Sequence, residues 1–318
     1  MARISIVTPA RPGARNGNRH TAARWAGFLR QSGHRVSVMT QWDGRSCDLL
    51  LALHARRSHA SVVAYRRRFA DRPIVVALTG TDLYQDLPES LEARQSLQLA
   101  DRIIVLQSEA RLKLKKTLRR KTRVVYQSAD PAVRHSPPRG RLRVAVVGHL
   151  RDVKDPFRAA LALAHVDAKV GVEVVQVGDA LSPAYAAQAR QIMRREPRYR
   201  WLGGRTHPQS LGWIARSHLL VVSSAMEGGA NVIAEAARIG TPVLASRVSG
   251  NVGMLGRNYP GFFPLFDERA LARLIMKGKE QRGFDKRLKR ALAARRRLFA
   301  PAAERRALLE ALRVKSRA

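Results

Sequence analysis

Two glutamates, Glu227 and Glu235, lie eight residues apart in the stretch SSAMEGGANVIAEAARIGTPVLAS, where an apolar strand gives way to a helix. Gly228 and Gly229 allow the backbone to approach a ligand closely, and the amide groups at the start of a helix bind phosphate. Carboxylates are poor ligands for phosphate but accept hydrogen bonds from sugar hydroxyls. The pattern therefore indicates a nucleotide sugar, with its pyrophosphate on the amides and its hydroxyls on the glutamates. The alternative interpretation is a surface loop and a helix that expose two solvated glutamates.

The polar loop PARPGARNGNRH, residues 9–20, follows the apolar segment ISIV. Most of its side chains donate hydrogen bonds, and several are cationic. Arginine binds phosphate oxygens through two parallel hydrogen bonds and keeps its charge. The loop is therefore predicted to bind an anion, and its candidate ligands are Arg15, Asn16, Asn18, Arg19 and His20.

Two further polar turns, LHARRS and LTGTDLY, follow other apolar segments of the first half of the chain. They add His54, Arg56 and Thr81 to the predicted anion site. Each of these residues also has a structural interpretation, as a helix cap or as part of a turn. The functional interpretation requires all three loops to lie at the carboxyl ends of strands in one sheet.

Twelve short apolar segments alternate with helical stretches along the chain, as buried parallel sheets require, so the fold class is α/β. A proline-rich stretch, SADPAVRHSPPRGR, separates the two halves and is typical of an interdomain linker. The segments are residues 4–7, 35–39, 48–53, 74–78, 102–106 and 123–126 in the first half, and 143–148, 172–178, 199–203, 219–224, 241–246 and 262–266 in the second.

This alternation predicts two doubly wound domains that face each other across a cleft, with ligands at the carboxyl ends of the strands. We expect a first domain over residues 1–130, a linker over 131–142 and a second domain over 143–284. The remaining residues, 285–318, are expected to form a basic helical tail that packs back across the first domain.

The chain of 318 residues carries 59 Lys and Arg against 24 Asp and Glu, a formal net charge of +35. Such a charge favours anionic partners: nucleic acid, a membrane surface or phosphorylated small molecules. The densest basic runs, residues 111–123 and 286–298, have helical periodicity, and their simplest interpretation is a solvated helix face. Because no signature of an RNA-recognition motif, zinc finger or helix-turn-helix occurs, nucleic acid is not predicted as a partner.

The cellular compartment is inferred from apolar windows and from cysteine content. No window reaches the roughly 18 consecutive apolar residues of a membrane span, and the N-terminus leads into a strand without a signal-peptide core. The single cysteine, Cys47, cannot form an intrachain disulfide and is interpreted as a structural thiol. We therefore expect a cytoplasmic protein with no stable membrane insertion.

The stretch from Glu227 to Glu235 resembles the E-x7-E motif of family-4 glycosyltransferases, which have the GT-B fold of two Rossmann-like domains. The resemblance implies that Glu227 contacts the donor sugar and that Glu235 contacts the ribose of the nucleotide. The sequence GHLRDVK resembles the family's G-R-L-x-x-x-K loop, which implies that Lys154 binds the donor phosphates. The implied donor site consists of His149, Arg151, Lys154, Gly204, Arg205, Glu227, Gly228, Gly229, Ala230, Asn231, Val232 and Glu235.

One position departs from that pattern, because His149 stands where the family has arginine. Either Arg151 or a protonated His149 then supplies the second positive charge. Gly204 and Arg205 belong to WLGGRTH, at the place of the family loop that borders the nucleotide base.

The polar loops of the first half resemble those of a narrower group, the selenosugar synthases of selenoneine biosynthesis. The resemblance implies that selenophosphate and a UDP-sugar, typically UDP-N-acetylglucosamine, are joined through a carbon–selenium bond at the anomeric carbon, with release of UDP. It also implies functional links to a selenophosphate synthetase and to a downstream selenoneine synthase. Selenium in selenophosphate is anionic at neutral pH, so it needs electrostatic capture more than a strong general base. The implied catalytic residues are Arg15, His20, Lys154 and Glu227.

Neither a metal ion nor a cofactor is predicted, because the sequence has no D-x-D motif and its histidines lack ligand spacing. Lys154 and helix amides would instead neutralise the departing UDP. Two alternatives stay open. One is a conventional GT-B glycosyltransferase with a hydroxyl acceptor, and the other is a basic nucleic-acid-binding protein with degenerate catalytic motifs.

Overall fold

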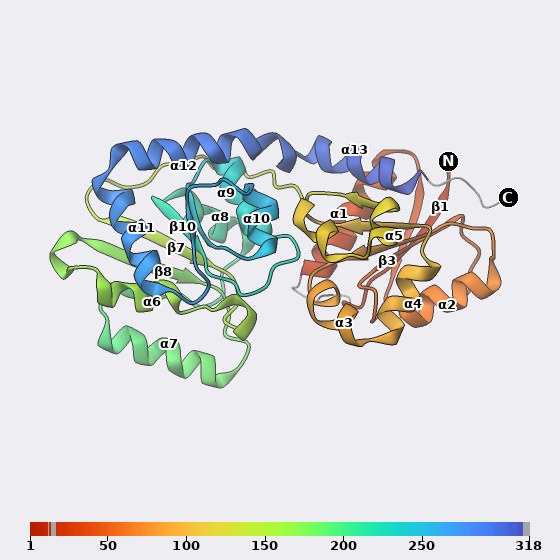
Figure 1. Cartoon of the computed structure of the whole chain (residues 1–318), viewed down its shortest axis with the longest axis horizontal. Helices are drawn as coiled ribbons and strands as arrows, with labels where there is room; N and C mark the ends of the chain where they lie inside the picture. Colours follow the sequence, from red (N-terminus) through yellow and green to blue (C-terminus); the bar gives the residue numbers. More distant parts are fainter. Residues whose placement is uncertain (12, 14–16, 314–318) are drawn as a thin grey trace. The chain divides into compact units, whose positions relative to one another are not determined.

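The computed structural model describes residues 1–11, 13 and 17–313, and it divides the chain into two compact units (Figure 1). Unit 1 comprises Met1–Gln127 together with the C-terminal segment from Pro301, and unit 2 comprises Ser128–Ala300. Within the described part of the chain, no helix is both long and apolar enough to cross a membrane.

Unit 1 contains a six-stranded parallel sheet in the order β2-β1-β3-β4-β5-β6. Its strands are β1 (Arg3–Val7), β2 (Arg35–Met39), β3 (Leu49–Leu53), β4 (Ile74–Leu78), β5 (Arg102–Val105) and β6 (Thr122–Val124). Its helices are α1 (Gly17–Gln31), α2 (His59–Arg68), α3 (Leu87–Glu89), α4 (Leu91–Leu99), α5 (Lys116–Arg120) and α13 (Pro301–Leu312).

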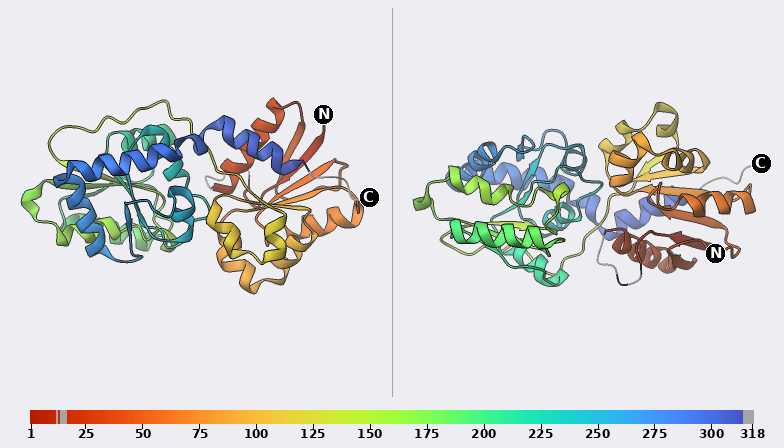
Figure 2. Two further views of the ribbon diagram at one scale, coloured as in Figure 1. Left: turned by 45° about the horizontal axis from the view of Figure 1, so that its top comes forward. Right: turned by 90° about the horizontal axis from the view of Figure 1, so that it is seen from below.

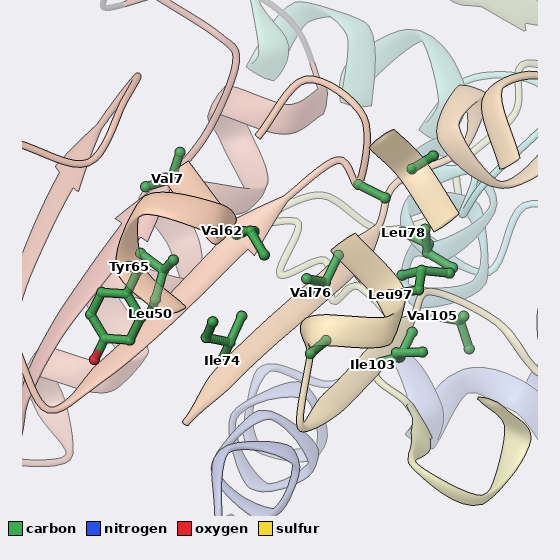
Figure 3. Close-up of a cluster of buried hydrophobic side chains, with 14 of the residues drawn as sticks. Val7, Leu50, Val62, Tyr65, Ile74, Val76, Leu78, Leu97, Ile103 and Val105 are labelled. Atoms are coloured by element: carbon green, nitrogen blue, oxygen red, sulfur yellow. The ribbon is translucent and has the colours of Figure 1, made fainter. Parts of the chain in front are cut away.

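The core of unit 1 forms two layers because successive strand residues point to opposite faces of the sheet. Leu50 of β3 packs with Val62 and Tyr65 of α2, and Figure 3 shows these side chains together on one face. The next residue, Leu51, packs on the other face with Trp25 of α1. Apolar residues at consecutive positions are therefore all buried, which explains the nearly continuous apolar segments in the sequence.

Unit 2 repeats the layered α/β architecture of unit 1 (Figure 2). Its six-stranded parallel sheet has the order β12-β11-β10-β7-β8-β9. Its strands are β7 (Leu142–Val147), β8 (Val172–Val177), β9 (Tyr199–Trp201), β10 (Leu219–Val222), β11 (Val243–Ser246) and β12 (Phe262–Phe263). Its helices are α6 (Arg158–Ala162), α7 (Pro183–Arg195), α8 (His207–Ala215), α9 (Asn231–Ile239), α10 (Ser249–Leu255), α11 (Glu268–Glu280) and α12 (Arg282–Arg295).

All twelve predicted strands overlap an observed strand, and the α/β prediction of two Rossmann-like domains is confirmed. The expected basic tail from residue 285 differs from the structure. Helix α12 belongs to unit 2, where Phe284, Leu288 and Leu292 form a buried stripe, and the chain joins unit 1 only at Pro301. An apolar residue every fourth position gives α12 one buried face, which holds it against unit 2.

The expected linker over residues 131–142 also packs against unit 2. Nε2 of His135 lies 2.9 Å from the backbone oxygen of Ser217, and the N–H of Ser136 donates to the backbone oxygen of Ala215 at 2.8 Å. At its far end, Leu142 already belongs to β7. The proline-rich composition therefore marks a segment without helix or strand that nevertheless belongs to a folded unit.

Helix α13 is anchored to unit 1 through a buried carboxylate, that of Glu304. Its Oε1 accepts a hydrogen bond from Nε1 of Trp25 at 2.7 Å, and its Oε2 lies 2.9 Å from Nε of Arg24. Both partners lie on α1, so the last described helix is tied to the first one. The C-terminal segment therefore completes one face of the unit 1 sheet.

Candidate active site

In unit 2, the first glutamate of the motif forms an ion pair with the predicted phosphate-binding lysine. Nζ of Lys154 lies 2.5 Å from Oε1 of Glu227, and Oγ of Ser224 donates to the same oxygen at 2.6 Å. The side chain of Glu227 is 8% exposed. The alternative of a solvated glutamate is therefore wrong for Glu227, and the structure brings together two predicted site residues from different loops.

Backbone and side-chain contacts join the loop that carries Lys154 to the loop that carries Glu227. Oγ of Ser223 donates to the backbone oxygen of Asp155 at 2.7 Å, and the N–H of Ala225 donates to the backbone oxygen of Val153 at 3.0 Å. These contacts set the position of Lys154 relative to the end of β10. The two loops that carry Lys154 and Glu227 are therefore joined below the ion pair by their own hydrogen bonds.

Asp155 adopts a left-handed backbone conformation, with φ of 43°. This conformation is uncommon outside glycine, although aspartate tolerates it better than most residues. Nε of Arg158 binds Oδ2 of Asp155 at 2.8 Å, and Nη1 of the same side chain binds Oε2 of Glu268 at 2.5 Å. The arginine therefore ties the strained turn after Lys154 to the start of α11.

A small cavity of about 20 Å³ lies beside the ion pair. Two of its lining residues have a buried nitrogen without a hydrogen-bond partner among the described residues, namely Nδ1 of His149 and Nε2 of Gln176. A volume of this size holds about one water molecule or one small polar group of a ligand. Sequence reasoning found His149 but missed Gln176, whose only signal was a polar residue inside the apolar segment VEVVQV.

One glycine beside Glu227 is required by close packing. A Cβ on Gly250 would lie 2.1 Å from the backbone oxygen of Glu227. A Cβ on Gly204 would meet only the carboxylate of Asp179, an exposed side chain that can turn away, so Gly204 keeps only its predicted role beside a base. Gly250 was not predicted, because an isolated glycine in a helix carries no specific signal.

The second glutamate of the motif, Glu235, lies on α9 with its side chain 14% exposed. Its Oε1 is 2.9 Å from Nε2 of His207, the first residue of α8. The alternative of a solvated glutamate is therefore wrong for Glu235 as well. Sequence reasoning missed His207, although it quoted the stretch WLGGRTH that ends with this residue.

The start of α9 is suited to an anion because its N-cap residue, Ala230, has no side-chain oxygen with which to cap the first helix amides. Asn231 begins the helix and Val232 follows it, and Val232 lines the small cavity. Gly228 and Gly229 are half-buried in the loop before the helix. The predicted order of loop, glycines and helix start is therefore confirmed, whereas its ligand remains a prediction.

The remaining cationic candidates of unit 2 face solvent. Arg151 and Arg205 are both exposed, and Nη1 of Arg205 donates to the backbone oxygen of Gly204 at 2.8 Å. Basic residues on the outer face of α12 are exposed too, as expected for a solvated helix face; they are Lys286, Arg287, Lys289 and Arg290.

In unit 1, the structure brings His54 and Thr81 together at the carboxyl ends of β3 and β4. Nε2 of His54 lies 3.2 Å from Oγ1 of Thr81. Nε of Arg56 lies 3.0 Å from Oδ1 of Asp86, a residue that sequence reasoning missed. The predicted convergence of these two polar turns is therefore confirmed as geometry, and Arg56 already has an acidic partner.

The buried carboxylate of Asp82 holds the turn LTGTDLY together through hydrogen bonds to backbone amides. Its Oδ1 accepts hydrogen bonds from the backbone N–H groups of Thr79 at 2.9 Å, Gly80 at 2.8 Å and Leu83 at 3.1 Å, and its Oδ2 accepts one from Ala55 at 3.1 Å. Burial raises the pKa of Asp82, whereas the neighbouring His54 and these backbone donors act in the opposite direction. The carboxyl group therefore joins both turns into one structure.

The first predicted anion loop is shorter than expected. Arg15 and Asn16 lie outside the described residues. Asn18, Arg19 and His20 lie in the first turn of α1, where Oγ1 of Thr21 donates to the backbone oxygen of Gly17 at 2.8 Å. The helix begins inside the polar run, because four residues after Gly17 an apolar stripe already packs against the sheet.

No group of three or more His, Cys, Asp and Glu side chains among the described residues is arranged to hold a metal ion. Lys154, Glu227 and the start of α9 form a charged and polar cluster in unit 2. His54, Thr81 and Asp86 form a polar cluster in unit 1. Each cluster lies at the carboxyl ends of parallel strands in its own unit, where ligands of such sheets bind.

Comparisons with solved structures agree with this architecture. HepE of Anabaena, solved in complex with UDP-glucose, matches with a TM-score of 0.77 and 18% identity over 98% of this chain and 99% of that chain. Sucrose-phosphate synthase of Thermosynechococcus elongatus matches with a TM-score of 0.80 and 16% identity over 98% of both chains. At these identities the likeness establishes the fold, which is that of GT-B proteins.

Sequence comparisons give the family. No curated protein sequence matches the chain. A sequence model of a family described as glycosyl transferases group 1 matches residues 132–296, more than half of the chain and almost all of unit 2. The chain therefore belongs to the group 1 family of glycosyl transferases.

Proposed function

We propose that unit 2 binds a UDP-sugar and that unit 1 binds the acceptor of its sugar. The observation that carries the donor part of this proposal is the partly buried ion pair of Lys154 and Glu227 beside the start of α9, whose N-cap residue Ala230 makes no side-chain cap. Lys154 would bind one phosphate, the carboxylate of Glu227 would bind sugar hydroxyls, and the amides at the start of α9 would bind the second phosphate. The similarity to HepE, which was solved with UDP-glucose and with UDP, supports this donor class.

Each donor contact follows from the chemistry of the group. Lys154 and the amides from Gly229 to Val232 would hold the pyrophosphate and stabilise charge as UDP departs. Glu227 would accept hydrogen bonds from the sugar, and Glu235 from the ribose. The other proposed donor-site residues are His149, Arg151, Gly204, Arg205, Gly228, Ala230 and Asn231.

We propose selenophosphate as the acceptor, on the strength of the three polar turns of unit 1 and their resemblance to selenosugar synthases. Selenium attacks the anomeric carbon, the bond from that carbon to the oxygen of UDP breaks, and UDP leaves with the electron pair. Water cleaves the phosphorus–selenium bond and releases inorganic phosphate. Arginine suits the capture of such an anion because it pairs with two oxygens at once. The proposed acceptor residues are Arg15, Asn16, Asn18, Arg19, His20, His54, Arg56 and Thr81.

A hydroxyl acceptor is the second candidate, and one observation favours it. Oδ2 of Asp86 lies 3.6 Å from Nε2 of His54, and a carboxylate beside a histidine is an arrangement that general bases use. An ordinary sugar hydroxyl needs such a base, whereas selenophosphate does not.

The two candidates are separated by incubating the protein with UDP-N-acetylglucosamine, with and without selenophosphate, under anaerobic conditions. UDP release is followed by chromatography, and the product is identified by mass spectrometry. The expected result is UDP release that depends on selenophosphate, together with a selenium-containing N-acetylhexosamine. UDP release that ignores selenophosphate and responds to a sugar alcohol would replace this proposal with the hydroxyl acceptor.

Two glutamate variants complete this experiment. Glu227→Ala removes the carboxylate next to Lys154, whereas Glu173→Ala removes a carboxylate that pairs with Arg143 at 2.6 Å in the same unit. We expect the first variant to lose at least tenfold in kcat/KM and the control to retain the activity of the unchanged protein. Equal losses in both would show that the effect is one of folding.

A further inference from the structure

The first observation concerns the backbone of His54, which has φ of 74° although the residue is not glycine. Its side chain is only 2% exposed, and its N–H donates to the backbone oxygen of Ala77 at 2.8 Å. Such a conformation is rare, and it persists where the surroundings hold it in place. The imidazole therefore occupies a fixed position between β3 and β4.

The second observation concerns the two ring nitrogens of His54. The backbone N–H of Arg57 donates to Nδ1 at 3.3 Å, so Nδ1 acts as an acceptor and carries no proton. In a neutral imidazole the proton is then on Nε2. Nε2 lies 3.2 Å from Oγ1 of Thr81, so a proton on Nε2 would be donated to that oxygen. The Thr81 hydroxyl, having accepted this bond, keeps its own proton to donate.

The groups around the ring shift the pKa of His54 in both directions. Burial lowers the pKa of His54, Asp82 and Asp86 oppose this shift, and Arg56 and Arg57 add to it. Protonation of Nδ1 would also break the hydrogen bond from the Arg57 backbone. Burial and geometry therefore both favour the neutral ring near neutral pH.

We propose that His54 stays in the neutral tautomer with its proton on Nε2, and that it positions the Thr81 hydroxyl to donate a hydrogen bond to an anionic acceptor. The role toward the acceptor rests on the proposed function, whereas the tautomer does not. His54 is then a positioning residue and not a general base. The polar cluster of unit 1 accordingly selects a nucleophile that is already deprotonated when it binds, as selenophosphate is.

Nuclear magnetic resonance tests the tautomer without any substrate. The full chain is labelled with ¹⁵N-histidine, and long-range ¹H–¹⁵N correlation spectra are recorded between pH 6 and pH 8. The His54 signals are identified by their loss in His54→Gln. We expect the pattern of a neutral ring protonated at Nε2 throughout this range. A ring protonated at Nδ1, or one that becomes cationic above pH 6, would overturn the proposal.

Steady-state kinetics tests the positioning role. We expect His54→Ala and Thr81→Val each to raise the KM for selenophosphate about tenfold, with less than a threefold change in kcat, because each removes one hydrogen bond to an anion. His54→Gln and Thr81→Ser, which restore a donor, should each regain most of the loss. The double variant should be no worse than about twice either single variant, because both act through one hydroxyl.

A matched control is His59→Gln, since His59 pairs with Ser96 at 3.0 Å on the neighbouring helices and has no proposed role in the reaction. Its KM for selenophosphate should not change. A tenfold fall in kcat for His54→Ala, with a pH–rate profile that loses its ascending limb, would identify His54 as a base and overturn the positioning role. If selenophosphate is not a substrate at all, the proposed acceptor fails, while the spectra still decide the tautomer.

Discussion

Nζ of Lys154 and Oε1 of Glu227 are 2.5 Å apart, although the residues are 73 positions apart in the chain. The two side chains that are proposed to bind the phosphates and the sugar of the donor thus neutralise each other before the donor arrives. Binding must replace this ion pair by contacts with the donor. The first prediction follows from that exchange.

Glu227→Gln should separate binding of the nucleotide from binding of the sugar. Removing the carboxylate frees Lys154 for phosphate, so UDP should bind as tightly as before or a few times more tightly. Lys154→Ala should weaken UDP binding about 10- to 100-fold, because a hydrogen bond to a charged group contributes about 1.5–3 kcal/mol. Isothermal titration calorimetry with UDP measures both. Weaker UDP binding in Glu227→Gln would contradict the exchange.

Arg158→Ala should raise the KM for the UDP-sugar several-fold while kcat changes little. The arginine joins Asp155, directly after Lys154, to Glu268 on α11, so its loss loosens the turn that aims the lysine. Arg198→Ala is the matched control, because it breaks an ion pair with Glu196 at 2.6 Å elsewhere in unit 2. Initial-rate kinetics on both variants checks this; an unchanged KM in Arg158→Ala would refute the positioning of Lys154 by this network.

Gly250→Ala should reduce activity at least tenfold. The added Cβ would lie 2.1 Å from the backbone oxygen of Glu227, so the loop that carries this glutamate must move. Gly27→Ala is the matched control, because nothing lies within 4 Å of its added Cβ and the residue is inside α1. There alanine should stabilise unit 1 by about 0.5–1 kcal/mol. Activity assays and thermal unfolding of the two variants measure these opposite effects.

Unfolding temperature should fall as the pH is lowered from 7 to 5. Burial lowers the pKa of His135 and of His218 in the folded chain, so the unfolded chain binds more protons below its own histidine pKa of about 6.5. The contribution of these histidines to stability is present above that pH and is lost as the pH falls.

Variants of these histidines make the pH prediction specific. His135→Gln should reduce the fall in unfolding temperature between pH 7 and pH 5, and His165→Gln, at an exposed position, should leave it unchanged. Differential scanning calorimetry at the two pH values provides the comparison. An identical fall in the two variants would assign the effect to other groups.

Much of the fold was predictable because local patterns suffice for it. Segments such as LLLAL and IVVAL are apolar at every position, which only a sheet covered on both faces can bury. The division of the last 34 residues was not predictable in the same way. Helices that contain both arginine and leucine lie on both sides of Pro301, and only the tertiary structure shows that Leu288 is buried in unit 2 and Leu308 in unit 1.

Part of the candidate site was likewise predictable from local sequence patterns, and part was not. The spacing of Glu227 and Glu235, with glycines between them and an apolar strand before them, was enough to predict a loop and a helix start. Asp86, Gln176 and His207 were missed, because a single polar residue in a helix or strand has the same local pattern whether it caps, packs or binds. Their roles depend on neighbours that lie far away in the chain.

The sequence by itself therefore determined the strands, the helix that carries Glu235 and the residue types that can bind phosphate and sugar. These features depend on hydrophobic periodicity and on the spacing of residues within short segments of the chain. Only the tertiary structure decided that Lys154 pairs with Glu227, that His207 pairs with Glu235 and that Nε2 of His54 lies beside the hydroxyl of Thr81. Parallel strands bring loops from distant positions to one sheet edge, and the tautomer of a histidine is set by whichever donor the fold places beside it.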